Sequence, residues 1–430
     1  MSATVQARRL MPDLEIVVIE RGAWTSYSAC GIPYLASGAV HAAEDLVVRR
    51  PEDFRSMRVD VRTGHEVVAL DLEARRAEVH NLTHGRSFHL GFDFLLLATG
   101  SRPERPDSAG FDLPHVHGVS TLDDATTLVR HAREHSAEKV VVVGSSLRGL
   151  EMAEAFRARG AAVTVLEAGP EMLPLLDADL AGQVARAVRE AGITVETGVV
   201  ALSVSEDLVE TGADPVPADL VILGSGVVPN SELGAGAGLR TGEAGALVVD
   251  RRQRTTGEGV WAAGDCCQSV HRVTGNPTYQ PLGSVAARQG RVAGINLGGG
   301  YATFAGVLGT AVGRVGGLEI GRSGLSQSEA ERAGFAAVAA TVESSTADRF
   351  LAESRPTSVR LVAERGSGRL LGVQSVGGPG SAKRVDVVAA ALVGGLTVED
   401  LIGLDLGYAP PVSTVWDPLQ AAARELLGGL

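Results

Sequence analysis

Short apolar runs rich in β-branched residues recur along the chain and predict buried strands. These runs occupy residues 15–20, 94–100, 139–144, 162–167, 218–224 and 259–265. Runs of this length that are apolar throughout are typical of parallel strands covered on both faces. Stretches with helical periodicity at 2–10, 150–159 and 178–191 separate several of them. The alternation of the two kinds of element predicts an α/β fold with doubly wound parallel sheets.

One segment, residues 139–169, combines a strand, a glycine turn, a helix and a second strand. Gly144, Ser146 and Gly149 occupy the three positions of a G-x-G-x-x-G turn, and Glu167 ends the second strand, near the spacing of about 20 residues expected for a ribose-binding acid. Such a turn lets a pyrophosphate approach the N–H groups at a helix start. Ser146 departs from the pattern because it replaces a glycine, and its Cβ narrows that approach. We expect a dinucleotide site, and because no basic residue directly follows the acid, NADH is favoured over NADPH.

The first residues resemble the second half of that unit. Residues 2–10 are helix-like, a strand follows, and Glu20 stands where Glu167 stands in the later unit. By equal spacing, the corresponding glycine turn and its strand would precede Met1, so we expect roughly a dozen residues of a complete βαβ unit to be missing from the printed sequence. The alternative is a chain that simply begins with a helix.

Composition limits the class of protein. A length of 430 residues suggests about three domains. The net charge of −12 is spread along the chain, which argues against a nucleic-acid or anionic-membrane partner because either would need a basic patch. Hydrophobic residues make up 45% and charged residues 21%, as in globular proteins. The 54 glycines beside only 4% aromatics indicate many tight turns of the kind that bind ligands.

The cysteines and histidines give few signs of a disulfide framework or a metal site. There are three cysteines, two of them adjacent at Cys266 and Cys267, and we expect this pair to be small buried residues, since adjacent cysteines close only a strained ring. His115 and His117 have no cluster of acids or cysteines beside them, so no metal is predicted. No run approaches the ~18 apolar residues of a membrane helix, and residues 1–10 lack a signal-peptide core. We therefore expect a cytoplasmic protein.

Seven motifs then occur in a fixed order along nearly the whole chain. They are SYSACGIPY around Cys30, ATGSRP at 98–103, the unit at 139–167, GSGVVPN at 224–230, WAAGD at 261–265, PLGSVAARQGRVAG at 281–294 and YAPPVSTVWDP at 408–418. In this order they resemble the FAD-dependent pyridine nucleotide-disulfide oxidoreductases, specifically the single-cysteine branch of CoA-disulfide reductases and NADH oxidases or peroxidases.

The resemblance implies two Rossmann-like dinucleotide-binding domains and a C-terminal α+β dimerisation domain of a homodimer. The implied FAD-binding domain is discontinuous, at 1–112 and 245–312, and lacks its first strand and glycine loop. The NAD-binding domain is expected at 113–244 and the dimerisation domain at 313–430.

Cys30 is the candidate redox centre. Pro33 follows it closely, which suits the first turn of a helix, and a cysteine at a helix start is stabilised as the nucleophilic thiolate. An inert buried cysteine is the alternative. Because no second cysteine lies nearby in the sequence, electrons would leave Cys30 through a mixed disulfide, a persulfide or a sulfenate.

The resemblance also implies roles for residues in the two cofactor sites. Those expected at FAD are Glu20, Arg21, Val67, Ala98, Thr99, Gly100, Gly264, Asp265, Leu282 and Gly283. Those expected at the nicotinamide dinucleotide are Gly144, Ser146, Gly149, Glu167, Gly224 and Gly226. Glu151 would act beside the stacked rings, although a carboxylate near a helix N-terminus is also favourable on dipole grounds alone.

The substrate site carries mixed signals. By resemblance, the residues expected to contact CoA are Ser2, Gln6, Arg9, Ser26 and Arg62, although Arg8 and Arg9 could equally form a solvated helix face. Ala29 replaces the asparagine usual before the cysteine, Ala287 stands where a polar residue is common, and residues 348–351 lack the expected paired tyrosines. Tyr408 remains, and it could protonate a leaving thiolate from the partner subunit or simply pack at the interface.

These signals predict a homodimeric enzyme that passes electrons from NADH through FAD to Cys30, and so cleaves a CoA-type disulfide or persulfide. NADPH stays possible as the reductant. One alternative is an NADH oxidase or peroxidase that cycles Cys30 through a sulfenate. Another is a flavin-poor relative without catalysis.

Overall fold

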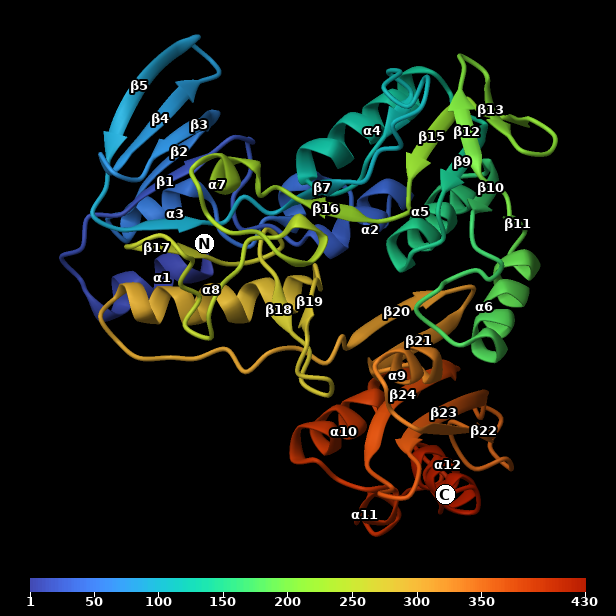
Figure 1. Cartoon of the computed structure of the whole chain (residues 1–430). Coiled ribbons are helices and arrows are strands. Elements are labelled where there is room, and N and C mark those ends of the chain that lie inside the picture. Colours follow the sequence, from blue (N-terminus) through green and yellow to red (C-terminus); the bar gives the residue numbers. More distant parts are fainter.

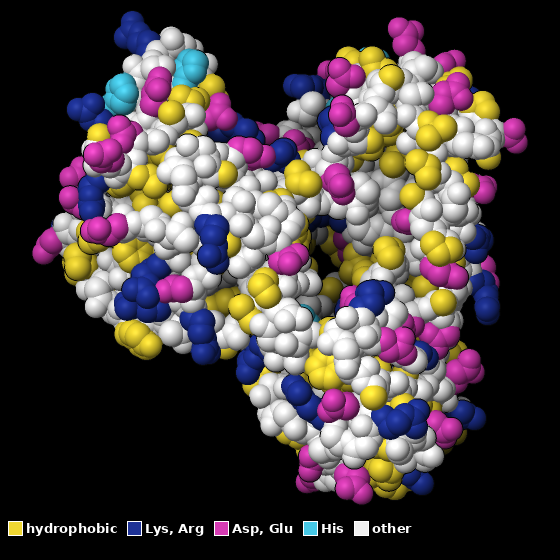
Figure 2. Space-filling model, in the orientation of Figure 1, with side chains coloured by type: hydrophobic (Ala, Val, Ile, Leu, Met, Phe, Trp, Pro, Cys, Tyr) yellow, Lys and Arg dark blue, Asp and Glu magenta, His cyan; other side chains and the backbone are white.

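A computed structural model describes all 430 residues of the chain, and Figure 1 shows them arranged in three lobes. The first lobe combines elements from the start of the chain with elements that follow the second lobe, so that blue and yellow segments lie side by side. The second lobe spans β8 to β15, and the third spans β20 to the end. The space-filling view shows a deep notch between the upper parts of the first and second lobes (Figure 2).

The second lobe contains a five-stranded parallel sheet. In spatial order its strands are β11 (Thr194–Thr197), β10 (Ala162–Glu167), β9 (Lys139–Val143), β15 (Leu220–Leu223) and β8 (Val116–His117). Its helices are α4 (Leu122–Glu134), α5 (Leu147–Ala158) and α6 (Ala178–Glu190). A small antiparallel sheet adds β12 (Ala201–Val204), β13 (Leu208–Thr211) and β14 (Val216–Pro217). The strands predicted at 139–144, 162–167 and 218–224 are confirmed.

Helix α5 begins at Leu147, ahead of the predicted start at residue 150. The cause is Ser146, whose hydroxyl accepts the Gly149 N–H at 3.2 Å and caps the helix. The serine that departs from the glycine pattern therefore has a structural role.

The first lobe holds two parallel pairs and an antiparallel sheet. One pair is β1 (Val17–Glu20) with β2 (Asp60–Thr63), the other is β6 (Leu95–Leu97) with β17 (Val260–Ala262), and the antiparallel sheet is β3 (His65–Asp71), β4 (Arg76–Asn81) and β5 (Arg86–Gly91). The strands predicted at 15–20, 94–100 and 259–265 are present, but they divide between the two separate pairs. Two short antiparallel pairs complete the lobe. They are β7 (Ser101–Pro103) with β16 (Val227–Pro229), and β18 (Ser269–Val270) with β19 (Pro277–Thr278).

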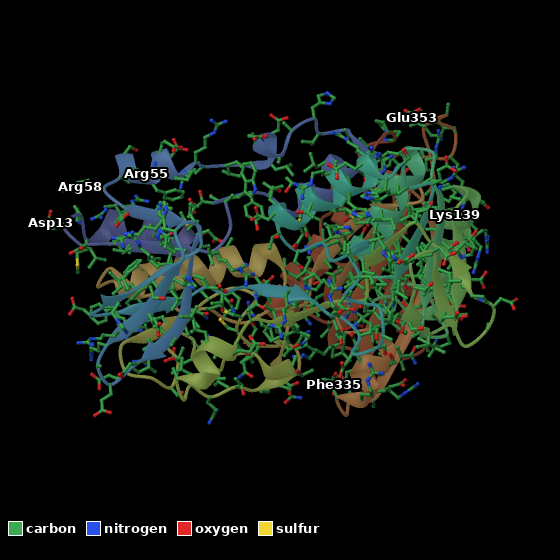
Figure 3. The ribbon with its side chains drawn as sticks, turned by 90° about the horizontal axis from the view of Figure 1, so that it is seen from above. Asp13, Arg55, Arg58, Lys139, Phe335 and Glu353 are labelled. Carbon is green, nitrogen blue, oxygen red and sulfur yellow. The ribbon has the colours of Figure 1, made fainter.

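The helices of the first lobe are α1 (Ser2–Leu10), α2 (Ile32–Ser37), α3 (Pro51–Ser56), α7 (Glu232–Gly236) and α8 (Gly283–Leu297). Helices α1 and α8 lie side by side (Figure 1) and approach closely through glycine, since a Cβ on Gly294 would lie 2.2 Å from the Ala3 carbonyl oxygen. Beyond α1, the guanidinium of Arg58 holds the next turn by donating to the Pro12 carbonyl oxygen at 2.9 Å. Seen from above, Arg58 and Asp13 lie at the end of the molecule opposite Lys139 (Figure 3).

The third lobe is built on a five-stranded antiparallel sheet. Its order is β20 (Ala311–Val315), β21 (Leu318–Gly324), β24 (Leu370–Gly377), β23 (Pro356–Glu364) and β22 (Ala337–Ser345). Helices α9 (Gln327–Arg332), α10 (Ser381–Gly394), α11 (Val398–Ile402) and α12 (Pro418–Leu427) accompany it. A separate cluster of 22 buried apolar residues forms the core of this lobe. The chain has no helix that is both long and apolar enough to cross a membrane.

Candidate active site

Cys30 lies where the first and second lobes meet. It belongs to a short 3-10 turn, Ala29–Gly31, that leads directly into α2, and its thiol is free and exposed. Ile32 and Leu35 of α2 are buried in the same apolar cluster as the core of the second lobe. The predicted helix start is therefore present. The exposed thiol thus stands just before the first residue of a helix that is anchored in the core.

Two motifs that are far apart in the sequence are joined by Asn230. Its backbone N–H donates to the Gly100 carbonyl oxygen at 2.9 Å, and its side-chain amide donates to the Thr99 carbonyl oxygen at 2.9 Å. The Thr99 hydroxyl in turn donates to the Asn230 carbonyl oxygen. The ATG segment after β6 is thereby fixed against the segment after β16. Sequence reasoning quoted Asn230 as part of a motif but gave it no role.

Asp265 has the environment expected of a cofactor ligand. Its carboxylate accepts one hydrogen bond, from the Ser101 hydroxyl at 3.2 Å, and burial raises its pKa. Gly264 before it has φ +90°, and its N–H donates to the Gln289 amide oxygen at 2.9 Å. A half-buried carboxylate with unused acceptor capacity can take a hydroxyl donor of a bound ligand. The arrangement therefore fits the ribityl chain of FAD.

The start of α8 also has room for a ligand. Leu282 precedes the helix without a side-chain cap, and nothing lies within 4 Å of a Cβ placed on Gly283. Gly100, after Ala98 and Thr99, is equally open and has φ +69°. Unsatisfied N–H groups at the start of this 15-residue helix suit an electron-rich group.

Glu20 and Glu167 occupy equivalent places at the ends of β1 and β10. In each case the carboxylate accepts the N–H of the residue two positions on, Gly22 at 2.7 Å and Gly169 at 2.8 Å. Burial raises the pKa of Glu20. The internal repeat predicted from the sequence therefore extends to hydrogen bonding. Near Glu20 on the same lobe are Arg21, which is paired with Glu66 at 3.4 Å, and Val67 of β3.

The glycine turn of the second lobe packs on the segment after β15. Gly144 has φ +97°, and a Cβ there would lie 2.3 Å from the Ser225 Cα. A Cβ on Gly149 or on Gly224 would lie 2.8 Å from the Gly144 carbonyl oxygen. These glycines are therefore required by the contact between two loops, as well as by any approaching pyrophosphate. Gly226 continues the second loop, and its carbonyl oxygen accepts from the Glu104 N–H at 3.0 Å.

Glu167 is held in one orientation by that same turn. Its second carboxylate oxygen accepts from the Ser145 N–H at 3.0 Å and from the Ser145 hydroxyl at 2.5 Å. The hydroxyl also accepts the Leu173 N–H at 2.8 Å. A fixed acid at the end of β10 fits the ribose of a nicotinamide dinucleotide.

Glu151 lies at the boundary between the second and third lobes. Burial raises its pKa to about 7, against an opposing contribution from Arg148. Its carboxylate is 3.5 Å from the position of a Cβ on Gly313 in β20. A carboxyl group with this pKa can exchange a proton near neutral pH. Sequence reasoning missed Arg148, because an arginine inside a glycine-rich turn has no pattern of its own.

The residues expected at CoA lie on three different segments. Ser2, Gln6 and Arg9 share α1, and Ser2 is next to Gly290 of α8. Ser26 lies in the loop before Cys30 with φ +49°. The Arg62 guanidinium is paired with Asp60 at 2.6 Å and stacked over the Phe88 ring, so its charge is already partly neutralised. The roles of all five residues stay predictions.

Tyr408 stands on an exposed surface of the third lobe. Its hydroxyl donates to the Asp348 carboxylate at 2.8 Å, and this hydrogen bond raises the tyrosine pKa. Exposed apolar side chains occur on the same two segments, namely Phe350, Val412, Val415 and Trp416. An apolar surface of this kind suits contact with a second protein chain.

The last residues considered are the adjacent cysteines and the histidines at β8. Cys266 and Cys267 are buried, as expected, with their sulfur atoms 3.8 Å apart. Burial raises the pKa of Cys267, whereas the hydrogen bond with Cys267 lowers that of Cys266 to about 7. His117 packs edge-on against His131, but no three metal-ligating side chains gather anywhere in the chain.

Comparison with protein families identifies the class. Residues 1–290 match the family described as pyridine nucleotide-disulphide oxidoreductase, and residues 313–418 match the dimerisation domain of the same family. The chain belongs to the pyridine nucleotide-disulphide oxidoreductases.

Individual relatives match over nearly the whole length. An NADH oxidase of Methanocaldococcus jannaschii is 34% identical over 98% of this chain and 94% of its own. A CoA-dependent NAD(P)H sulfur oxidoreductase of Pyrococcus furiosus is 33% identical over 99% of this chain and 96% of its own. The structure of an NAD-dependent persulfide reductase from A. fulgidus is 33% identical with a TM-score of 0.96, covering 100% of this chain and 81% of that one.

The comparisons confirm the family, the α/β fold class and the redox-enzyme class that the sequence predicted. FAD and a pyridine nucleotide are the cofactors of this class. The domain boundaries and the roles of single residues stay predictions.

Proposed function

We propose that this enzyme reduces a CoA-type disulfide or persulfide with NADH, and that Cys30 is its redox-active thiol. The observation that carries the proposal is the isolation of Cys30. It is the only exposed cysteine, and the other two are buried together beside Asp265. Cys30 therefore has no internal partner for a disulfide and must bond covalently to its substrate.

The chemistry balances with one thiol. The Cys30 thiolate attacks one sulfur of the substrate, forms a mixed disulfide and releases the first product as a thiolate. Two electrons from NADH then cleave the mixed disulfide, which returns the Cys30 thiolate and releases the second product. Two protons complete the two product thiols, one of them supplied with the hydride by NADH and one by solvent. FAD, when bound, relays the electron pair between NADH and Cys30.

The described residues fit both cofactors. Glu20 would hold the adenosine ribose of FAD, Asp265 its ribityl chain, and the start of α8 the ring system. Glu167 would hold the adenosine ribose of NADH, and the turn from Gly144 to Gly149 its pyrophosphate. These roles are supported by the half-buried Asp265 carboxylate, which accepts only one hydrogen bond, and by the fixed orientation of Glu167.

The test is consumption of NADH by FAD-loaded protein with oxidised CoA or a CoA persulfide as acceptor. Cys30→Ser should abolish this turnover while the FAD content and NADH binding stay as in the wild type. Cys267→Ala is the matched control, since Cys267 is buried and should be dispensable. Turnover that survives Cys30→Ser would overturn the proposed mechanism.

A second candidate function is NADH peroxidase or oxidase activity. The similarity to an NADH oxidase supports it, as does the absence of a second tyrosine beside Tyr408. Peroxide would oxidise the Cys30 thiolate to a sulfenate with release of one water. Two electrons from NADH, with one proton from the hydride and one from solvent, would then return the thiolate and release the sulfenate oxygen as a second water. NADH consumption with peroxide or oxygen that exceeds consumption with oxidised CoA would favour this function.

The same purified protein tests the assembly and the flavin-poor alternative. We propose a homodimer, supported by the dimerisation-domain match and the exposed apolar side chains near Tyr408. Three free thiols support a reducing, cytoplasmic setting.

The flavin content of the purified protein tests the alternative of a relative that does not bind FAD. Stoichiometric flavin absorbance would refute that alternative.

A further inference from the structure

Arg148 is a charged side chain without a charged partner at the junction of the lobes. It is the second residue of α5, and it is half-buried. Its Nη1 donates to the Val119 carbonyl oxygen at 3.0 Å, and it forms no ion pair. A guanidinium has five N–H donors, so most of this hydrogen-bonding capacity is unused.

The charge of Arg148 reaches carboxyl groups in two lobes. It lowers the pKa of Glu151, one turn further along α5, and that of Asp265 in the first lobe, in each case against the larger effect of burial. The positive charge of Arg148, at the second position of α5, therefore favours the ionised form of both carboxyl groups.

Backbone donors point to an anion at the same place. Ser146 caps α5 by accepting the Gly149 N–H, and the N–H groups of Leu147 and Arg148 have no acceptor within the chain. Free N–H groups in the first turn of a 12-residue helix favour negative charge. The free N–H groups of Leu147 and Arg148 and the Arg148 guanidinium thus all belong to the first turn of α5.

We propose that the Arg148 side chain binds the pyrophosphate of NADH and sets the affinity of the enzyme for its reductant. The proposal rests on the proposed NADH site at the turn from Gly144 to Gly149. The planar guanidinium matches two phosphate oxygens better than an ammonium group does. Val119 orients the guanidinium before the coenzyme arrives, which reduces the entropy lost on binding.

ADP-ribose is the probe, because it carries the pyrophosphate but no nicotinamide and therefore cannot reduce the enzyme. Its dissociation constant would be measured by calorimetry on FAD-loaded protein at two salt concentrations. Arg148→Gln should weaken binding about tenfold or more, as expected for loss of a charge-assisted contact, and should reduce the salt dependence. Arg148→Lys should recover part of the affinity. Arg157→Gln, in the last turn of the same helix, should behave as the wild type.

Three results would overturn the proposal. If Arg148→Gln leaves the ADP-ribose affinity unchanged and raises the pKa of Glu151, Arg148 only offsets the negative charge of nearby carboxylates. Loss of FAD with unchanged ADP-ribose affinity would place the contact on the flavin cofactor. An affinity that falls equally in Arg148→Lys would indicate disruption of the turn. Failure of the wild type to bind FAD or ADP-ribose would instead refute the proposed function itself.

Discussion

The Arg360 guanidinium of β23 donates through Nε to the Asp177 carboxylate at 3.0 Å and so joins the third lobe to the second. Both side chains are largely buried, at 17% and 15% exposure. Gln374 completes the contact by donating to the same carboxylate and accepting the Asp177 N–H, each at 2.8 Å. This buried junction fixes α6 on the sheet of the third lobe.

Removal of Arg360 should destabilise the protein strongly. Arg360→Ala leaves the Asp177 carboxylate buried without its cation, and we expect a loss of about 3–5 kcal/mol in the free energy of unfolding. Chemical denaturation measures it. Lys383→Ala is the control, because its ion pair with Asp386 is exposed and should be worth about 0–1 kcal/mol. Equal losses in the two variants would contradict a special role for the buried pair.

The choice between NADH and NADPH should depend on Glu167. Its carboxylate is held by Ser145 and Gly169, so it would repel the extra phosphate of NADPH. Glu167→Ala with Ala168→Arg removes that repulsion and adds a phosphate partner. We expect the ratio of kcat/KM for NADH over NADPH to fall at least tenfold, and Ala168→Arg alone to change it less. An unchanged ratio would place coenzyme selection elsewhere.

Glu151 should make stability depend on pH. Burial raises the pKa of its carboxyl group from the usual 4.5 to about 7, so between these two pH values the folded state retains a proton that the unfolded state loses. The stabilisation from this group is complete at acid pH and is lost as the pH rises through about 7. Glu151→Gln should therefore raise Tm relative to the wild type more at pH 8.5 than at pH 5.5.

Glu258→Gln is the control for that pH series, because its side chain is 95% exposed. Its effect on Tm should be small at every pH. A Glu151→Gln effect that is equally independent of pH would show that the carboxyl group is not buried in the folded protein.

Local sequence pattern predicted the elements well and the contacts between them poorly. The strand at 162–167 and the helix at 178–190 appear almost as predicted, because their apolar spacing is decided by neighbouring residues. The contacts of Arg148, Asn230 and Arg360 could not be predicted, since their partners lie in other lobes or beyond intervening segments. The sequence also did not predict that the first lobe has two separate parallel pairs of strands, because an apolar run does not specify which other strand it will pair with.

Tyr408 should act on the substrate step alone. The Asp348 carboxylate accepts from its hydroxyl at 2.8 Å and raises its pKa, which keeps the phenol protonated and able to donate. If Tyr408 protonates a leaving thiolate at the partner's site, Tyr408→Phe should slow disulfide turnover by about a hundredfold or more. Reduction of bound FAD by NADH, followed by stopped-flow absorbance, should not change. Tyr301→Phe, at another exposed tyrosine, controls for loss of a surface hydroxyl, and equal slowing of both steps would assign Tyr408 to dimer packing.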